Sequence, residues 1–131
     1  MFIAIGIGSN TPQAQSNVAC AIAWLKTRVA GLCASEIYQT DGVGAKSRGT
    51  RYCNAVATGH TDMSAGEITS LLKDYEQANG RVKGNREITI DLDLVVYGAE
   101  VLRPTDFAHT YFQRGFRQLA SETIQAVSDK V

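Results

Sequence analysis

Apolar and polar residues alternate most regularly between positions 88 and 97, where the chain reads Ile-Thr-Ile-Asp-Leu-Asp-Leu-Val-Val-Tyr. A period of two is typical of a β-strand with one buried face. The apolar face consists of Ile88, Ile90, Leu92, Leu94 and Val96. The opposite face consists of Thr89, Asp91, Asp93, Val95 and Tyr97. The pattern therefore predicts a strand that packs on the core with one face and presents two carboxylates on the other.

Three more segments have the pattern of strands. Residues 2–7 alternate between isoleucine and smaller or aromatic residues, and residues 51–58 alternate between Cys53, Ala55, Ala57 and the set of Tyr52, Asn54, Val56. Residues 32–40 are rich in strand-forming residues but alternate less cleanly. A short strand over 100–102 is also expected.

Two segments instead repeat apolar residues at the spacing of a helix. The first starts at Thr11-Pro12 and carries Val18, Ile22, Leu25 and Val29. The second follows a capping box, Ser64 to Glu67, and carries Ile68, Leu71, Leu72 and Tyr75 before it ends near Gly80. Such stripes predict amphipathic helices. A third helix is expected from about Arg114 to Val131.

The order of these elements is β-α-β-β-α-β, the ferredoxin-like split arrangement. We therefore predict an α+β fold in which two helices cover one face of an antiparallel sheet and the other face is open for function. A C-terminal helix completes it. The 131 residues are expected to form a single domain, residues 1–131.

Asp91 and Asp93 suggest a metal site. Their Cα atoms are expected roughly 6.5–7 Å apart at strand rise, and like charges so close are costly unless a cation neutralises them. Mg²⁺ suits oxygen ligands and leaves positions for water and phosphate. A basic, glycine-bearing segment, residues 80–86, lies just upstream and could reach phosphates. The alternative is a merely solvated strand edge.

Composition narrows the function classes. Formal net charge is zero, so nothing indicates a nucleic-acid or membrane partner, and a ferredoxin-like RNA-binding module is disfavoured. No apolar run has the length of a membrane span and no signal-peptide pattern is present. Three cysteines without metal-ligand spacing fit small buried thiols in a reducing compartment. A cytoplasmic protein is expected.

Six short motifs occur in an order that resembles one family. They are Gly6-Ile7-Gly8-Ser9-Asn10, Ile37-Tyr38-Gln39-Thr40, Tyr52-Cys53-Asn54-Ala55, Glu76 with Gly80-Arg81-Val82, Ile90-Asp91-Leu92-Asp93, and Arg114-Gly115-Phe116. Together they resemble 6-hydroxymethyl-7,8-dihydropterin pyrophosphokinase of folate biosynthesis. The resemblance runs from about Ile3 to Phe116.

The resemblance implies an ATP-dependent enzyme that transfers pyrophosphate from ATP to the pterin hydroxymethyl group and releases AMP. ATP would be the co-substrate, and two Mg²⁺ ions would be held by Asp91 and Asp93. The partners would be these small molecules, with the protein a monomer or weak homodimer.

The resemblance also implies roles for individual residues. The pterin-binding set is Thr40, Val43, Tyr52, Asn54 and Phe116. The ATP-binding set is Glu76, Arg81, Lys83, His109, Tyr111 and Arg114. The catalytic set is Arg81, Lys83, Asp91 and Asp93. Simpler interpretations stay open: Tyr52 and Phe116 as core aromatics, His109 as a surface histidine and Glu76 as a solvated charge.

The chain also departs from the family pattern. The segment between Arg81 and Asp91 is shorter than usual and lacks a Trp, Ile88 replaces an Arg, and the usual C-terminal extension is missing. Because a closing loop completes many active sites, the alternative is a degenerate relative that binds pterin or nucleotide without catalysis.

Overall fold

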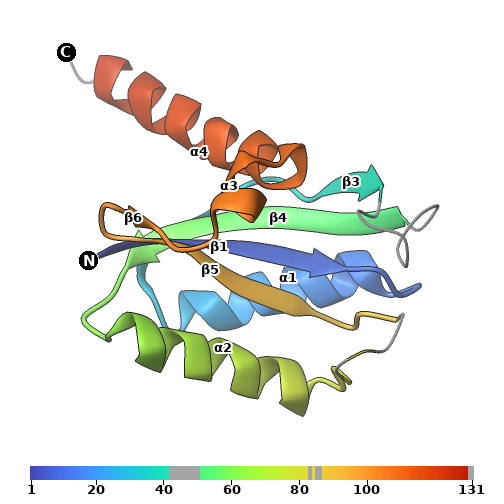
Figure 1. Cartoon of the computed structure of the whole chain (residues 1–131). Coiled ribbons are helices and arrows are strands. Elements are labelled where there is room, and N and C mark those ends of the chain that lie inside the picture. The colour runs from blue at the N-terminus through green and yellow to red at the C-terminus, as the bar shows by residue number, and fades with distance from the viewer. Residues whose placement is uncertain (42–50, 83, 85–86, 130–131) are drawn as a thin grey trace.

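A computed structural model describes residues 1–41, 51–82, 84 and 87–129 of the chain, and for 121–129 only the course of the helix (Figure 1). Of the site residues expected from the sequence, Val43 and Lys83 lie outside the described residues. The elements in chain order are β1 (Phe2–Ser9), α1 (Ala14–Lys26), β2 (Ala30–Ala34), β3 (Tyr38–Asp41), β4 (Arg51–His60), α2 (Ala65–Ala78), β5 (Asp91–Tyr97), β6 (Glu100–Val101), α3 (Pro104–Ala108) and α4 (Thr110–Asp129).

The strands form one antiparallel sheet in the order β2-β4-β1-β5-β6, with β3 also paired to β4. This order confirms the predicted ferredoxin-like arrangement, because β4 and β5 both flank β1. The strand expected over 32–40 is two strands along the same edge of β4. Ser35 separates them: its backbone N–H donates to the Val56 carbonyl at 2.8 Å and its hydroxyl accepts from the Val56 N–H at 2.9 Å.

Helices α1 and α2 pack on one face of the sheet, below it in Figure 1. The capping box expected before α2 is present, with Ser64 and Glu67 bonded to each other's backbone N–H. The core beneath the helices contains Ile3, Ile5 and Ile7 of β1, Val18 and Leu25 of α1, Ile68 and Leu72 of α2, and Leu92 and Leu94 of β5. Burying such aliphatic side chains is the main stabilising contribution to a domain of this size.

The strand expected over 88–97 differs from the prediction in two ways. It begins at Asp91, not Ile88, and a bulge interrupts its pairing with β1, because Ile5 faces Leu94 whereas Ala4 faces Val96. At this bulge two residues of β5 oppose one residue of β1, so the residues of β5 after the bulge point to the faces opposite to those expected. Val96 packs beside Val95 on the second face of the sheet, the face opposite α1 and α2. Tyr97 turns toward the helix-covered face, and its hydroxyl donates to the Met63 carbonyl at 2.8 Å. The expected faces are therefore wrong for Val96 and Tyr97.

The second face of the sheet is only partly open. Helix α4 begins at Thr110, four residues before the expected start, and follows a short α3 that the sequence analysis did not predict. Both lie above the sheet in Figure 1. Phe112 and Leu119 pack there on Ala4, Val56, Val95 and Val96. Gly115 allows this approach, since a Cβ at that position would stand 2.8 Å from the Val56 side chain.

Two further expectations concern membrane-spanning helices and the three cysteines. No helix among the described residues combines the length and the apolar character needed to cross a membrane. All three cysteines are free, but Cys20 and Cys33 are exposed and Cys53 is half-buried. The expectation of buried thiols is therefore wrong for Cys20 and Cys33.

Candidate active site

A cavity of about 240 Å³ lies on the second face, between the sheet and the α3–α4 segment. Residues of β1, β3, β4 and β5 contribute to its wall, together with residues of α3 and α4. The lining residues are Gly6, Ile7, Gly8, Thr40, Asp41, Tyr52, Asn54, Ala55, Ile88, Asp91, Asp93, Val95, Arg103, Asp106, Tyr111 and Phe112.

Two glycines of β1 create the space in the middle of this site. Gly8 pairs with Asn54 on one side and with Asp91 on the other, and Gly6 pairs with Asp93. Side chains of paired residues lie on the same face of a sheet. Because the central strand carries no side chain at these two positions, the amide of Asn54 and the carboxylates of Asp91 and Asp93 face a shared open volume.

Asn54 and Thr40 form the first polar region of the cavity. Asn54 is 8% exposed. The Thr40 hydroxyl donates to the Asn54 amide oxygen, and the Asn54 amide nitrogen donates to the Ile7 carbonyl at 3.3 Å. An amide has two N–H donors and two acceptor lone pairs, so capacity for a ligand remains on both ends of the group. Tyr52 lines the same end of the cavity.

Asp91 and Asp93 form the second polar region, and a lysine bridges them. The Lys73 ammonium of α2 lies 3.2 Å from Asp93 Oδ1 and 4.0 Å from Asp91 Oδ1. It also donates to the Leu92 carbonyl at 2.9 Å and to Glu76 Oε2 at 3.0 Å. Burial lowers the pKa of Lys73, but the charges of Asp93, Glu76 and Asp91 outweigh that effect and raise it. The ammonium is therefore a stable positive charge among three carboxylates.

The two aspartates repel each other. Burial, the charge of Asp93 together with a hydrogen bond to it, and the charge of Glu76 raise the pKa of Asp91 to about 7, although the charge of Lys73 opposes the shift. Like charges in close proximity cannot both ionise easily without a cation. A divalent cation favours the ionised form of both groups, so the electrostatics of the pair suit metal binding.

The donor set fits Mg²⁺ in particular. Among the residues that the structure describes, no group of three or more His, Cys, Asp and Glu side chains could hold a metal ion. Mg²⁺ does not need such a group, since it binds one or two carboxylates and completes its octahedron with water and phosphate. Asp91 and Asp93 supply that number of carboxylates, and they already hold one positively charged group.

Arg103, Asp106 and Tyr111 form the wall opposite the sheet. Arg103 Nε donates to Asp106 Oδ2 at 2.5 Å, and an Arg103 terminal nitrogen lies 3.9 Å from Asp93 Oδ1. The Tyr111 hydroxyl donates to Asp106. Burial, Asp106 and Asp93 raise the pKa of Tyr111, so its phenol remains a neutral hydrogen-bond donor. The wall thus places a guanidinium beside the aspartate pair.

Sequence reasoning missed Lys73 and Arg103. The signal for Lys73 was its spacing, because residues three apart on a helix lie on one side and Lys73 precedes Glu76 by three. For Arg103 the only signal was a cation immediately before Pro104, at a position that favours the start of a helix. Neither signal points to a site without the tertiary structure.

The structure brings together six of the residues expected from the sequence. Thr40, Tyr52, Asn54, Asp91, Asp93 and Tyr111 all line the cavity. Glu76 does not line it. Glu76 is instead 6% exposed, and its Oε2 accepts from the Leu92 backbone N–H at 2.6 Å as well as from Lys73. Glu76 is therefore no solvated surface charge; it links α2 to β5 behind the aspartates.

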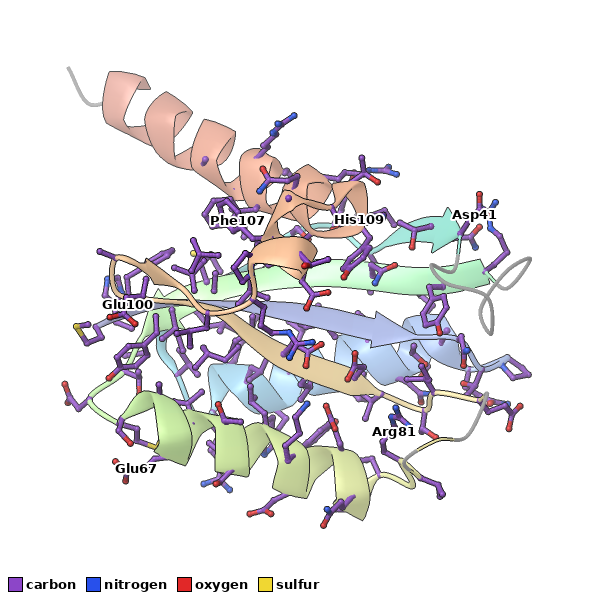
Figure 2. The ribbon with its side chains drawn as sticks, in the orientation of Figure 1. Asp41, Glu67, Arg81, Glu100, Phe107 and His109 are labelled. Carbon is purple, nitrogen blue, oxygen red and sulfur yellow. The ribbon has the colours of Figure 1, made fainter. Side chains whose placement is uncertain are left out.

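Four other expected residues lie away from the cavity. The Arg81 guanidinium donates to the Val82 carbonyl at 2.5 Å, and Figure 2 shows Arg81 below the sheet, beyond the end of α2. His109 stacks on the Tyr111 ring with centroids 4.4 Å apart. The Arg114 guanidinium lies over the Tyr38 ring, 4.7 Å from its centroid, and 3.9 Å from Glu36. Phe116 stacks on Phe112 at 5.4 Å.

Phe116, expected in the pterin-binding set together with Asn54, therefore does not line the cavity. Phe112, one helical turn before Phe116, lines the cavity together with Tyr111 of the same helix. Phe116 instead packs against Phe107 and Phe112 in the second core cluster. Residues four apart on a helix share a face, so both rings lie on the side of α4 that packs on the second core cluster, and Phe116 lies one turn farther along the helix.

The arrangement has the features of a site for an elongated, two-part ligand. One region offers amide and hydroxyl groups beside aromatic rings, as a flat heterocycle requires. The other offers a carboxylate pair suited to a divalent cation, with an arginine beside it, as a phosphate group requires. The chemistry that fits both regions joins a heterocycle to a phosphate.

Comparison with known proteins agrees with this geometry. Residues 4–121 match the family described as 7,8-dihydro-6-hydroxymethylpterin-pyrophosphokinase (HPPK). The chain is also similar to 2-amino-4-hydroxy-6-hydroxymethyldihydropteridine pyrophosphokinase of Haemophilus influenzae, with 31% identity over 104 residues. That match covers 78% of this chain and 64% of the relative, so the chain spans less than two thirds of that protein's length.

Proposed function

The chain belongs to the 7,8-dihydro-6-hydroxymethylpterin-pyrophosphokinase family, and on this premise we propose that it transfers pyrophosphate from ATP to 6-hydroxymethyl-7,8-dihydropterin in folate biosynthesis. In this reaction the pterin hydroxyl oxygen bonds to the β-phosphorus of ATP. The bond between that phosphorus and the α,β-bridging oxygen breaks, AMP leaves, and the hydroxyl proton is released. The observation that carries the proposal is that Asn54 faces Asp91 and Asp93 across Gly6 and Gly8 in one shared cavity.

We assign the pterin to the region around Asn54. The Asn54 amide can both donate to and accept from the amide-like edge of a pterin ring, and the Thr40 hydroxyl fixes the amide orientation through its hydrogen bond to the amide oxygen. Tyr52 lines this region and supplies an aromatic surface. Val43 remains a proposed wall residue from the family resemblance.

We assign the triphosphate to the region around Asp91 and Asp93, which would hold two Mg²⁺ ions. Bound Mg²⁺ supplies neutralisation of the triphosphate charge. Arg103 adds a cation beside Asp93, and Tyr111 supplies a neutral phenol. Transfer of a phosphoryl group depends mainly on positioning and charge stabilisation, which these side chains can provide.

The remaining assignments follow from the family resemblance. Arg81, His109 and Arg114 would contact the triphosphate from positions other than those described above, and Lys83, outside the described residues, remains a proposed triphosphate contact. Phe116 would stack on the pterin only if it replaced Phe112 at the cavity wall. Glu76 supports the site from behind, by holding Leu92 and Lys73.

The surroundings proposed for the reaction follow from its substrates and from the chain. ATP and a reduced pterin are small cytoplasmic molecules, and three free cysteines suit a reducing compartment. We therefore assign the reaction to the cytoplasm. A net charge of zero gives no reason to expect a nucleic-acid partner. We also propose a monomer or weak homodimer, as the family resemblance implies.

The direct test combines purified protein, ATP, Mg²⁺ and 6-hydroxymethyl-7,8-dihydropterin and measures AMP by chromatography. We expect AMP that appears only when the pterin is present and in equal amount to the pterin consumed. The same assay is run on Asn54→Ala, which we expect to form AMP more slowly than the natural protein. Asn79→Ala, an exposed substitution outside the cavity, is the matched control. AMP formation at equal rates in all three proteins would contradict the assignment of Asn54.

One observation favours a second candidate function. The Lys73 ammonium already neutralises Asp91 and Asp93, as a protein without a metal requirement would need. A non-catalytic relative that binds pterin or nucleotide is the alternative. Tight binding of the pterin without any AMP at saturating ATP and Mg²⁺ would favour it.

A further inference from the structure

Lys73 is held by groups of two kinds. Two of its partners, the Leu92 carbonyl at 2.9 Å and Glu76 Oε2 at 3.0 Å, are not proposed metal ligands. The other two are Asp93 Oδ1 at 3.2 Å and Asp91 Oδ1 at 4.0 Å. An ammonium has three donors. Its shortest contacts are thus to groups that remain available when the aspartates bind something else.

The position of the ammonium is also adjustable. The Lys73 side chain is 42% exposed, compared with 8% for Glu76 and 19% for Asp93. A flexible four-carbon stem carries the charge. The ammonium can therefore retreat from Asp93 toward solvent while it keeps Glu76 and the Leu92 carbonyl, and the carboxylates do not have to move.

We propose that Lys73 is a built-in counter-ion of the Asp91–Asp93 pair, which a divalent cation displaces, so that this residue sets how tightly the site takes a metal. The inference rests on the proposed function in one respect, since it takes the aspartate pair as the metal site. It assigns to Lys73 the role of a positioning residue: the ammonium holds the two carboxylates in place before the metal arrives.

Competition explains why such a residue weakens metal binding. A metal ion that reaches the pair meets a positive charge already close to both carboxylates, and two cations at this separation repel. Without Lys73 the metal would no longer compete with an ammonium for the two carboxylates. The same removal would leave Glu76, Asp91 and Asp93 with less compensating charge, which destabilises a metal-free protein.

The test compares Lys73→Met with Lys73→Arg, using Mn²⁺ alone as the probe and no nucleotide or pterin. Methionine keeps the unbranched stem and removes the charge, whereas arginine keeps the charge. Electron paramagnetic resonance measures the concentration of free Mn²⁺ directly. We expect Lys73→Met to bind Mn²⁺ about tenfold more tightly than the natural protein, and Lys73→Arg to stay within about twofold of it. Lys26→Met, at an exposed position at the end of α1, should bind as the natural protein does.

Thermal unfolding provides the second readout. We expect Lys73→Met to have a lower Tm than the natural protein without metal, and saturating Mg²⁺ to remove most of that difference, because a bound cation replaces the missing charge. If Lys73 had a merely structural role, Lys73→Met would lower Tm by the same amount with and without Mg²⁺. That result, or Mn²⁺ affinity in Lys73→Met no tighter than in the natural protein, would overturn the proposal.

Failure of this inference and failure of the proposed function are distinguishable. The Mn²⁺ and Tm experiments contain neither substrate. If AMP forms but Lys73→Met binds Mn²⁺ no more tightly, the counter-ion role is wrong and the enzyme stands. If Lys73→Met binds Mn²⁺ more tightly but no AMP forms in either protein, the counter-ion role stands and catalysis is wrong.

Discussion

The side-chain amide nitrogen of Asn54 lies 3.0 Å from the point at which a Cβ on Gly8 would stand. Gly8 does not have a positive φ, so its backbone does not require glycine. The space around this position requires glycine instead. Gly8 lies between Asn54 and Asp91 in the sheet, and any side chain there would enter the volume that joins the two polar regions of the cavity.

The first prediction is that Gly8→Ala weakens pterin binding. A methyl group requires the Asn54 amide to give way by a few tenths of an ångström from its place against Ile7, and disturbing the hydrogen bonds of a buried polar group costs about 1–3 kcal/mol. We expect a loss of tenfold or more in pterin affinity, measured by fluorescence titration, without loss of fold by circular dichroism. Gly66→Ala, where the Cβ would come no closer than 4.0 Å to Ser64 Oγ, is the control and should bind normally.

The second prediction concerns the contact that holds α4 to the sheet. A Cβ on Gly115 would stand 2.8 Å from Val56 Cγ2, 2.9 Å from Ser35 Oγ and 2.9 Å from the Tyr38 hydroxyl. Overpacking of this kind typically costs about 1–3 kcal/mol. Gly115→Ala should lower the free energy of unfolding by that amount in urea titrations. Arg117→Ala, at an exposed position of the same helix, should change it little, and equal stability of the two variants would contradict the packing described here.

The third prediction uses the buried hydroxyl of Tyr38. It donates to the Tyr111 carbonyl at 2.5 Å and accepts from the Gly115 N–H at 3.2 Å. Burial raises the pKa of Tyr38 above its ordinary value of 10.0, although the Gly115 N–H and Arg114 oppose the shift. The folded state therefore prefers the protonated phenol. Its contribution is fully present below pH 10 and is lost as pH rises through the higher folded-state pKa.

Tyr38→Phe isolates this effect. The variant should be less stable than the natural protein at pH 8, because it loses both hydrogen bonds. Above pH 10 the difference between the two should shrink, since only the natural protein has to keep Tyr38 protonated. Urea unfolding at a series of pH values measures the difference. A gap that is constant from pH 8 to pH 11 would show that Tyr38 titrates as it does in the unfolded chain.

Periodicity was sufficient to predict most of the fold. The alternation in β1 and β4, the helical stripe with the capping box of α2, and the order of elements together predicted the sheet topology. Periodicity failed to predict the features of the fold that tertiary contacts determine. The bulge that turns Val96 and Tyr97 to other faces arises from the pairing of β5 with β1, and an alternating sequence has no local signal for it.

The positions of site residues on strands could be predicted from the sequence, whereas those of site residues on helices were less predictable. Asn54, Asp91 and Asp93 occupy fixed faces of paired strands, so their convergence follows from the strand order. The place of Phe116 depends on how α4 lies across the sheet, which the helical period alone does not determine. Lys73 depends on how α2 lies against β5. Their roles in binding and catalysis stay predictions.

The most direct test of the central claim is ³¹P nuclear magnetic resonance of ATP, Mg²⁺ and 6-hydroxymethyl-7,8-dihydropterin, with the natural protein and with Asp93→Asn. Asparagine nearly keeps the shape of aspartate and removes its charge, so the fold should persist while the proposed reaction loses a proposed metal-binding carboxylate. We predict AMP and a pterin diphosphate in equal amounts with the natural protein, and a rate lower by at least about a hundredfold with Asp93→Asn. Formation of ADP in place of AMP, or an unchanged rate in Asp93→Asn, would contradict the account.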